Sequence, residues 1–264
     1  MHQVIGKIID STEKRVKDIE NTSTYSDIHN THKRDIGYAI YKAKKDSIVP
    51  VIAEIKPASP STFYKDIPPQ KAVSIAKEME KAGAVAISVL TEPEYFHGSI
   101  DNLKFVRNEI ELPVLRKDFI IDGIQMDEAH SDLILLIASI LGDRLDEFVS
   151  LAQSKGLEPL VEVHNKNELE NALRTRTNII GVNNRNLDTL EINLQITSEL
   201  APLIKQYDSE NGTNHIIVSE SGIHTTDDVK RLIQYGADAL LIGTSIIKSD
   251  DIYSKTKELV EALK

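Results

Sequence analysis

The sequence has no cysteine among its 264 residues. This absence excludes disulfide bonds, thiolate catalysis and cysteine-ligated zinc, and it fits a reducing compartment. Long apolar runs are also absent: no window of 18 residues is uninterruptedly apolar, so no membrane-spanning helix is predicted. The first twenty residues carry charges throughout and lack the apolar core of a signal peptide, which predicts a cytoplasmic protein.

Signatures of nucleotide and metal binding are missing as well. The chain has no GxGxxG or P-loop pattern, and its eight histidines show no HExxH spacing. We therefore expect no nucleotide cofactor and no metal, and we interpret His97, His164 and His224 as polar loop residues rather than ligands. The net charge of −10 is spread along the chain and disfavours binding to nucleic acid or an anionic membrane. An anionic ligand then requires a local positive site.

From residue 48 onward, short apolar or β-branched runs alternate with segments of helical periodicity. The runs cover residues 49–56, 84–90, 113–120, 132–137, 158–164, 178–184, 215–221 and 238–243. Eight strands that alternate with helices, without a long linker, predict an α/β protein with a closed (β/α)8 TIM barrel. A doubly wound open sheet is the alternative.

The first 47 residues precede this alternation of strand-like and helical segments. Apolar positions such as Val4, Ile8 and Val16 recur at helical spacing, and a Ser/Thr/Asp-rich stretch follows at residues 21–30. We interpret residues 1–47 as an N-terminal helical extension of a single barrel domain that spans residues 1–264.

Polar side chains stand at the ends of most predicted strands, which is where barrels carry their chemistry. They are Glu54 and Lys56, Lys117, Glu162, Asn183, and Glu220 with Ser221. One alternative is that these charges pair with one another and merely fill the barrel mouth. Apolar residues would often be as stable there as a buried ion pair, so the clustering favours function. Lysines and glutamates in one desolvated mouth shift one another's pKa values, which is how a lysine becomes a usable acid near neutral pH.

The last two strand ends carry a second signal. The motifs "SESGI" and "LIGTSI" place Ser221, Gly222, Gly243 and Thr244 where barrels commonly bind a phosphate with backbone N–H groups. Each motif alone is also compatible with a simple turn, whereas the pair predicts a phosphorylated substrate.

Seven stretches resemble the indole-3-glycerol phosphate synthase family of (β/α)8 enzymes in tryptophan biosynthesis. The resemblance covers residues 48–247, and its stretches are "VIAEIKPASPS", "AISVLTEPEYFHGSIDNL", "LPVLRKDFIID", "LEPLVEVHNKNELENAL", "IIGVNNRNLDTLEINL", "IVSESGI" and "ADALLIGTSI". It implies ring closure of 1-(2-carboxyphenylamino)-1-deoxyribulose 5-phosphate, with loss of carbon dioxide and water and without metal or organic cofactor. It also implies that the N-terminal extension helps to cover the active-site face.

The resemblance assigns roles residue by residue. The family's general acid falls on Lys117, which would protonate the C2′ oxygen. Glu162, Glu54 and Lys56 would anchor the substrate and serve the proton transfers of decarboxylation and dehydration, and the division of these transfers among Lys56, Lys117 and Glu162 stays open. Asn183 and Ser221 complete the implied catalytic group. The implied substrate-binding residues are Ser59, Phe96, Phe119, Leu135, Arg185, Leu187, Glu220, Gly222, Gly243 and Thr244, of which Leu135 is equally well explained as ordinary core.

The sequence departs from the family pattern at two places near or beneath the site. After "FIID" it has Ile124 in place of the usual tyrosine, and the connection to the next strand is about three residues shorter. After Ser59 it reads "PSTFYKD" where a lysine–glycine pair is usual. We expect the first change to affect the stability face, and the second to affect turnover rate more than reaction type.

Two other functions are compatible with parts of the pattern. A phosphoribosylanthranilate isomerase shares the phosphate loops, but it typically relies on a cysteine base at the end of the first strand, and this chain has none. A catalytically silent barrel that serves as a partner in a pathway complex is the second alternative. The resemblance also permits association with other tryptophan-pathway enzymes.

Overall fold

Eight parallel strands form a closed barrel in the computed structural model, which describes residues 2–22 and 34–264. Around the barrel the strands are β1 (Val51–Ile55), β4 (Ala86–Leu90), β5 (Val114–Lys117), β6 (Leu133–Ile137), β7 (Glu158–Val163), β8 (Ile179–Asn183), β9 (Ile216–Glu220) and β10 (Ala239–Ile242). The predicted barrel is confirmed, and the open-sheet alternative is wrong because β10 pairs with β1.

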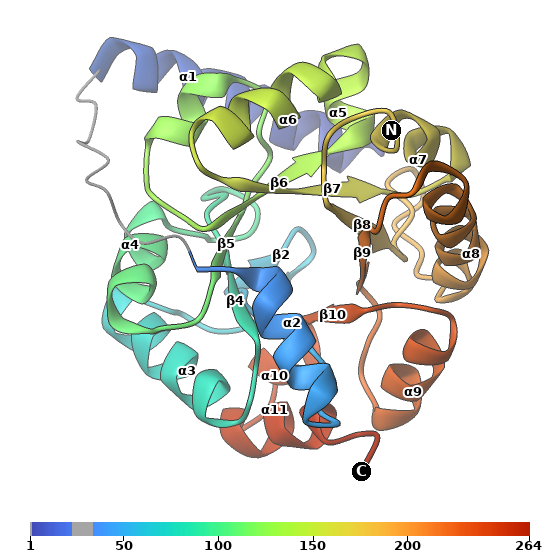
Figure 1. Ribbon diagram of the computed structural model, residues 1–264. Coiled ribbons are helices and arrows are strands. Elements are labelled where there is room, and N and C mark those ends of the chain that lie inside the picture. The colour runs from blue at the N-terminus through green and yellow to red at the C-terminus, as the bar shows by residue number, and fades with distance from the viewer. Residues whose placement is uncertain (1, 23–33) are drawn as a thin grey trace.

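Helices surround the strands, as Figure 1 shows in a view along the barrel. They are α3 (Pro69–Lys81), α4 (Ile100–Glu109), α5 (Ala138–Leu141), α6 (Leu145–Ser154), α7 (Lys166–Ala172), α8 (Gln195–Asn211), α9 (Thr226–Gln234), α10 (Thr244–Ile247) and α11 (Ile252–Val260), with a short 3-10 segment η2 (Gly142–Arg144). A small antiparallel hairpin, β2 (Ala58–Ser59) with β3 (Thr62–Phe63), follows β1. The loops that follow the strands therefore meet at one end of the barrel.

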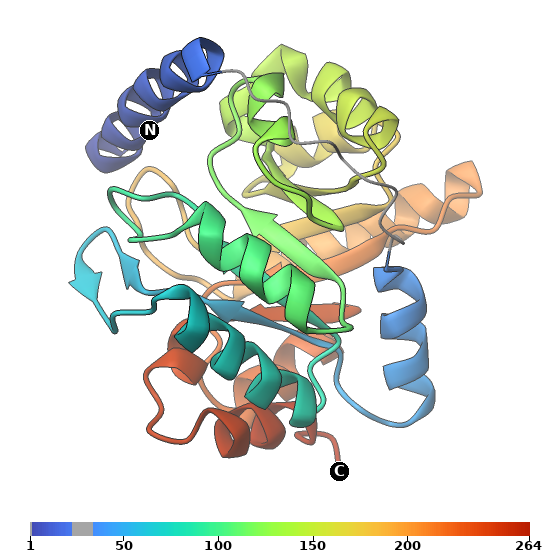
Figure 2. The same ribbon diagram turned by 90° about the vertical axis from the view of Figure 1, so that its left-hand side faces the viewer.

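The N-terminal extension contains the two helices expected of it. Helix α1 (Gln3–Thr22) lies at the same end of the barrel as the β2–β3 hairpin, and α2 (Ile36–Lys45) lies at the opposite end (Figure 2). The side chain of Asp35 accepts a hydrogen bond from the backbone N–H of Tyr38, which caps the start of α2. Most of the Ser/Thr/Asp-rich stretch lies outside the described residues.

Three apolar clusters make up the core. Two of them pack the outward faces of the strands against the surrounding helices. The third fills the barrel interior and also includes Ile5 and Ile8 of α1 and Ile36 and Ile40 of α2. The extension therefore closes both ends of the interior with apolar side chains, and α1 stands over the end where the site was predicted.

The connection between β5 and β6 holds a short 3-10 segment, η1 (Gly123–Asp127), in place of a full barrel helix. This confirms the short connection expected from the sequence. Helix α1 packs against η1, so the shortened connection contacts a helix at the site end and does not concern the stability face alone. Arg116 of β5 fills the space with a fully buried guanidinium that donates to the carbonyl of Gln125 and pairs with Glu128 at 2.6 Å.

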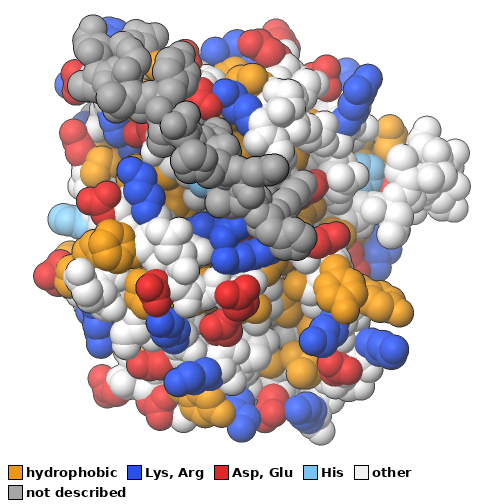
Figure 3. All heavy atoms as spheres, turned by 60° about the vertical axis from the view of Figure 1, so that its left-hand side comes forward, with side chains coloured by type: hydrophobic (Ala, Val, Ile, Leu, Met, Phe, Trp, Pro, Cys, Tyr) orange, Lys and Arg blue, Asp and Glu red, His pale blue; other side chains and the backbone are white. Residues whose placement is uncertain are grey.

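Charged groups are dispersed over the surface. Acidic and basic side chains lie among one another over the face shown in Figure 3, as the spread of charge along the sequence predicted. Within residues 2–22 and 34–264, every helix is too short or too polar to cross a membrane.

Gly181 of β8 leaves interior space that two neighbouring side chains occupy. A Cβ atom at this position would lie 2.3 Å from Oε1 of Glu220 and 2.6 Å from Cδ2 of Leu160. Both neighbours are fully buried, and a close-packed interior leaves them little room to move aside. Packing in the barrel interior thus requires a glycine here.

We expect Gly181→Ala to lower the free energy of unfolding by roughly 1–3 kcal/mol, because the added methyl group overpacks the interior. Gly6→Ala is the matched control, since its added Cβ on α1 meets open space. This control should raise the free energy of unfolding by up to about 1 kcal/mol. Urea unfolding measures both variants, and an unchanged stability of Gly181→Ala would contradict the packing argument.

Candidate active site

The predicted residues meet in one cavity of about 380 Å³ at the site end of the barrel. Those that line it are Glu54, Lys56, Ser59, Phe96, Lys117, Phe119, Leu135, Glu162, Asn183, Arg185, Leu187 and Ser221. A smaller pocket shares several of these residues and extends to Gly222, Gly243 and Thr244. Glu220 is fully buried and lines neither pocket, but it contacts Lys117.

Two lysines and two glutamates form an ion cluster, of which three members line this cavity while Glu220 is buried in contact with Lys117. Nζ of Lys117 lies 2.7 Å from Oε2 of Glu220 and 3.4 Å from Oε2 of Glu54. Nζ of Lys56 lies 3.1 Å from Oε1 of Glu54. Glu54 thus bridges the two ammonium groups, and Lys117 lies between two carboxylates.

The cluster shifts the pKa values of its members. Burial would lower the pKa of Lys117, but the carboxylates of Glu220, Glu54 and Glu162 outweigh it and raise this pKa above its usual range. Burial raises the pKa of Glu220 to about 7, against the attraction of Lys117. Burial would also raise the pKa of Glu54, but Lys56 and Lys117 hold it below its usual value. The direction at Lys117 is opposite to a lysine tuned toward neutral pH, because carboxylates surround it.

Glu162 faces the cavity from the next part of the barrel wall. Burial would raise its pKa, but His164, Lys117 and the side chain of Asn183 together lower this pKa to about 2. Asn183 also accepts a hydrogen bond from the backbone N–H of Arg185. Glu162 is therefore a carboxylate at neutral pH, while Glu220 is the carboxyl group of the mouth that titrates near pH 7.

One wall of the cavity is apolar. The rings of Phe96 and Phe119 lie 6.1 Å apart, next to Leu135 and Leu187 in the cavity lining. The carboxylate of Glu92 accepts hydrogen bonds from the backbone N–H groups of residues 94, 95 and 96, and so fixes the loop that presents Phe96. Glu92 was not singled out from the sequence, although a glutamate two residues after a predicted strand is a detectable signal.

The hairpin after β1 borders the larger cavity, whereas Tyr64, which follows it, and the loops after β9 and β10 border the smaller pocket. The hydroxyl of Tyr64 donates to Oγ of Ser59 at 2.9 Å and ties the hairpin together. Ser221 and Gly222 both have positive φ, at 68° and 80°. A Cβ on Gly243 would lie 2.5 Å from Oε1 of Glu54, so a glycine at the end of β10 makes room for the central glutamate.

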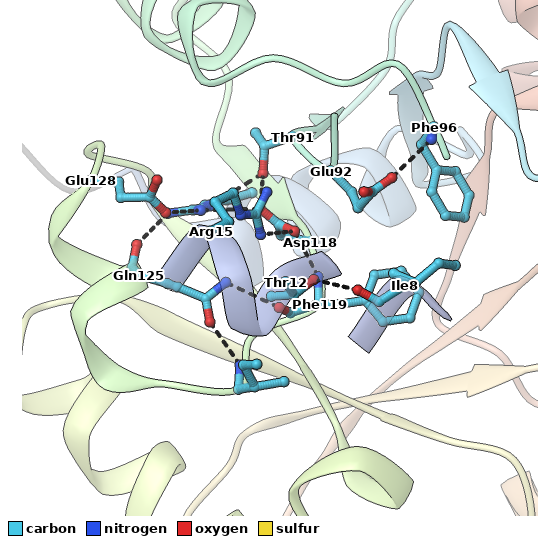
Figure 4. Close-up of polar contacts among 12 residues, drawn as sticks. Ile8, Thr12, Arg15, Thr91, Glu92, Phe96, Asp118, Phe119, Gln125 and Glu128 are labelled. Atoms are coloured by element: carbon cyan, nitrogen blue, oxygen red, sulfur yellow. Dashed lines mark hydrogen bonds and ion pairs between the residues drawn. The ribbon is translucent and has the colours of Figure 1, made fainter. Parts of the chain in front are cut away.

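Helix α1 lies over the site, as the resemblance implied for the N-terminal extension, but its individual contacts were not predicted from the sequence. His2, Val4 and Ile5 line the cavity, and the backbone N–H of His2 donates to the carbonyl of Leu187. Farther along the helix, Arg15 donates to Asp118 at 2.8 Å (Figure 4). Asp118 follows Lys117 directly in the chain, so this ion pair ties α1 to the strand that carries the central lysine.

The comparisons with known proteins agree with this geometry. A family model described as indole-3-glycerol phosphate synthase matches residues 5–259. A relative of that name from Methanocaldococcus jannaschii is 41% identical over 257 residues, which cover 94% of this chain and 93% of the relative. Relatives from Aquifex aeolicus and Ruminiclostridium cellulolyticum are 42% and 39% identical and cover 84% and 97% of this chain, and 86% and 98% of their own lengths.

Such identity over nearly the whole length of both proteins establishes common membership rather than a shared fold alone. The match also includes part of the N-terminal extension, since the family model begins at residue 5. The chain therefore belongs to the indole-3-glycerol phosphate synthase family.

Proposed function

We propose that this chain converts 1-(2-carboxyphenylamino)-1-deoxyribulose 5-phosphate to indole-3-glycerol phosphate, with Lys117 as the general acid. The observation that carries the assignment is the position of the Lys117 ammonium, 2.7 Å from Glu220 inside a cavity with one apolar wall. As the ring carbon attacks C2′, negative charge develops on the C2′ oxygen. An adjacent ammonium stabilises this charge and supplies the proton.

The bond changes balance without an added reactant. A bond forms between C2′ and the ring carbon that bears the carboxylate, and the C2′ oxygen takes a proton from Lys117. The bond to the carboxylate then breaks, carbon dioxide leaves, and its electron pair restores the aromatic ring. Finally the C2′ hydroxyl takes a second proton and leaves as water while C1′ loses a proton, and the one net proton consumed, which matches the loss of the carboxylate as neutral carbon dioxide, comes from solvent. We assign Glu162, an ionised carboxylate, to accept a proton in the dehydration.

The remaining predicted residues bind the two ends of the substrate. The apolar wall of Phe96, Phe119, Leu135 and Leu187 would hold the anthranilate ring against C2′. The backbone of Gly222, Gly243 and Thr244 would hold the phosphate, with Lys56 and Arg185 as nearby cations. Ser59, which lines the larger cavity, and Ser221, which lines both pockets, would orient the substrate, and Asn183 would support Glu162.

Several expectations stay predictions. They are a single domain over residues 1–264, a cytoplasmic location, independence from metal and cofactor, and association with other enzymes of the pathway. Among the described residues, no group of three or more histidine, aspartate or glutamate side chains is arranged to hold a metal ion. An assay in the presence of a chelator tests the metal expectation directly.

We expect the purified protein to convert the proposed substrate in the presence of a chelator, and Lys117→Ala to lower kcat by roughly a hundredfold or more. Indole fluorescence reports the product well, because the chain contains no tryptophan. The matched control is Lys77→Ala on α3, which removes an exposed lysine that pairs with Glu109. Its kcat should be unchanged.

The outcomes separate the alternatives. Thermal stabilisation by the substrate without any turnover would support the silent barrel and overturn the proposed function. Turnover that falls only a few fold in Lys117→Ala would leave the reaction in place and remove Lys117 from the role of general acid.

The raised pKa of Glu220 predicts a pH-dependent effect on stability. A carboxyl whose pKa rises from 4.5 to about 7 on folding binds its proton more tightly in the folded state. Its contribution is therefore present below pH 4.5 and lost as the pH rises through 7. We compare the free energy of unfolding of Glu220→Gln with that of the unmodified protein at each pH. We expect this difference to change by about 1–3 kcal/mol in favour of the variant as the pH rises from 4.5 to 8. Urea unfolding at several pH values measures this difference, and a constant difference would contradict the assigned pKa.

The tie between Arg15 and Asp118 predicts an effect on substrate affinity. Arg15→Ala removes a charge-assisted hydrogen bond that holds α1 over the cavity, so we expect KM to rise roughly three- to tenfold while kcat changes less. Lys14→Ala, an exposed position on the same helix, is the control. Steady-state kinetics measures both, and a KM that is equal in the two variants would show that α1 stays in place without the ion pair.

A further inference from the structure

His164 lies between two carboxylates at the edge of the candidate active site. It follows β7 directly, and its side chain is 6% exposed. Its Nε2 lies 3.2 Å from Oε1 of Glu162, and its Nδ1 lies 2.8 Å from Oε2 of Glu168 on α7. The imidazole therefore connects a carboxylate of the mouth to a carboxylate of the surrounding helix layer.

Glu168 fixes the orientation of the imidazole ring. Its Oε2 accepts from both the backbone N–H and the Nδ1 of His164, and its Oε1 accepts from the side chain of Asn165 at 2.6 Å. Asn165 in turn caps the start of α7, where its side chain accepts the backbone N–H of Glu168. Glu168 and Asn165 thus hold the ring in place next to Glu162.

The two contacts determine the protonation of the ring. The bond to Glu168 requires a proton on Nδ1, because a carboxylate has only acceptor atoms. A neutral ring would then present the lone pair of Nε2 to the carboxylate of Glu162, which is repulsive. Both nitrogens carry protons only in the imidazolium form, and that form attracts both carboxylates, with a hydrogen bond to Glu168 and an ion pair to Glu162.

The two lysines of the mouth form their ion pairs with carboxylates other than Glu162. Lys117 from β5 pairs with Glu220 from β9 and Glu54 from β1, and Lys56 pairs with Glu54. The ion pair of Glu162 is with His164. The other groups that face this pair are the amide of Asn183 on β8, Asp188 in the segment after β8, and Glu168. Lys117 also lowers the pKa of Glu162, whereas its own ion pairs are with Glu220 and Glu54. His164 is thus the cation that forms an ion pair with Glu162.

We propose that His164 is a positioning residue that stays an imidazolium, orients Glu162 toward the substrate and keeps this carboxylate ionised as the base. The proposal rests on the proposed function, because it concerns the role that Glu162 has there. Glu168 is the second member of this arrangement and holds the cation from the other side. The pKa of His164 agrees: burial would lower it, but Glu162 and Glu168 raise it to about 10.

The first test needs no substrate. In protein labelled with ¹⁵N at histidine, the imidazole signals that vanish in His164→Gln belong to His164. We expect these signals to show both ring nitrogens protonated at pH 8, since a free imidazole is largely neutral there. Signals of a neutral ring at pH 7 would overturn the proposal, whether or not the protein turns over the proposed substrate.

The second test is the pH profile of kcat/KM. His164→Gln keeps an amide donor near Glu162 but removes the positive charge. We expect its acid-side limb to move up by about one pH unit or more, so that kcat/KM measured on that limb is about tenfold lower while its value at pH 8 is unchanged. Glu168→Gln keeps the imidazole and should move the limb in the same direction by less, and it replaces the first variant if His164→Gln does not fold.

The matched control is His215→Gln. His215 is an equally buried imidazole paired with Asp208, and it precedes β9 at the opposite end of the barrel. Its loss should leave the pH profile unchanged. If the unmodified protein is active and the profiles of His164→Gln and Glu168→Gln coincide with that of the control, the positioning role is wrong while the proposed function stands. An inactive unmodified protein would instead overturn the proposed function, and the labelled histidine signals would still decide the charge of His164.

Discussion

The ion cluster of Lys117 with Glu220 and Glu54 is the constraint on which the rest of the site depends. Removing such charges from water costs several kcal/mol for each ion, and good mutual geometry offsets this cost. Apolar side chains would fill the same space at least as stably, so stability does not explain the cluster. Its value is chemical: an ammonium beside a desolvated carboxyl can donate a proton where negative charge develops on a substrate.

Glycines on or just after neighbouring strands leave room for this cluster, and surrounding loops and helices hold the residues next to it in place. Gly181 and Gly243 stand where a larger residue would collide with the carboxylates of Glu220 and Glu54. Around the cluster, the loop held by Glu92 presents Phe96, and helix α1 is tied down by Arg15. His164 supports the site from outside the cluster, because its ring contacts both Glu162 in the cavity and Glu168 on α7 in the helix layer. Carboxylates of the mouth thus form ion pairs with side chains from several strands and from the loop after β7.

The barrel itself follows from local patterns. Short β-branched runs that alternate with helical periodicity leave few topologies, and the parallel crossovers are right-handed and short. The sequence therefore predicted all eight barrel strands, and the strand ends located the charged residues on one face. It did not predict that the connection after β5 would keep only the 3-10 segment Gly123–Asp127, because that outcome depends on how α1 and Arg116 fill the space.

The sequence by itself determined which residue types stand at the strand ends, since strand alternation and the order of motifs are local properties. The tertiary structure decided which of them touch. Arg15 and Asp118 are far apart in the chain, and only the docking of α1 against η1 joins them. The pKa values of Lys117 and Glu220 likewise depend on distances between different strands. His164 looked like a polar loop residue because its two partners become neighbours of one ring only when β7 and α7 pack together.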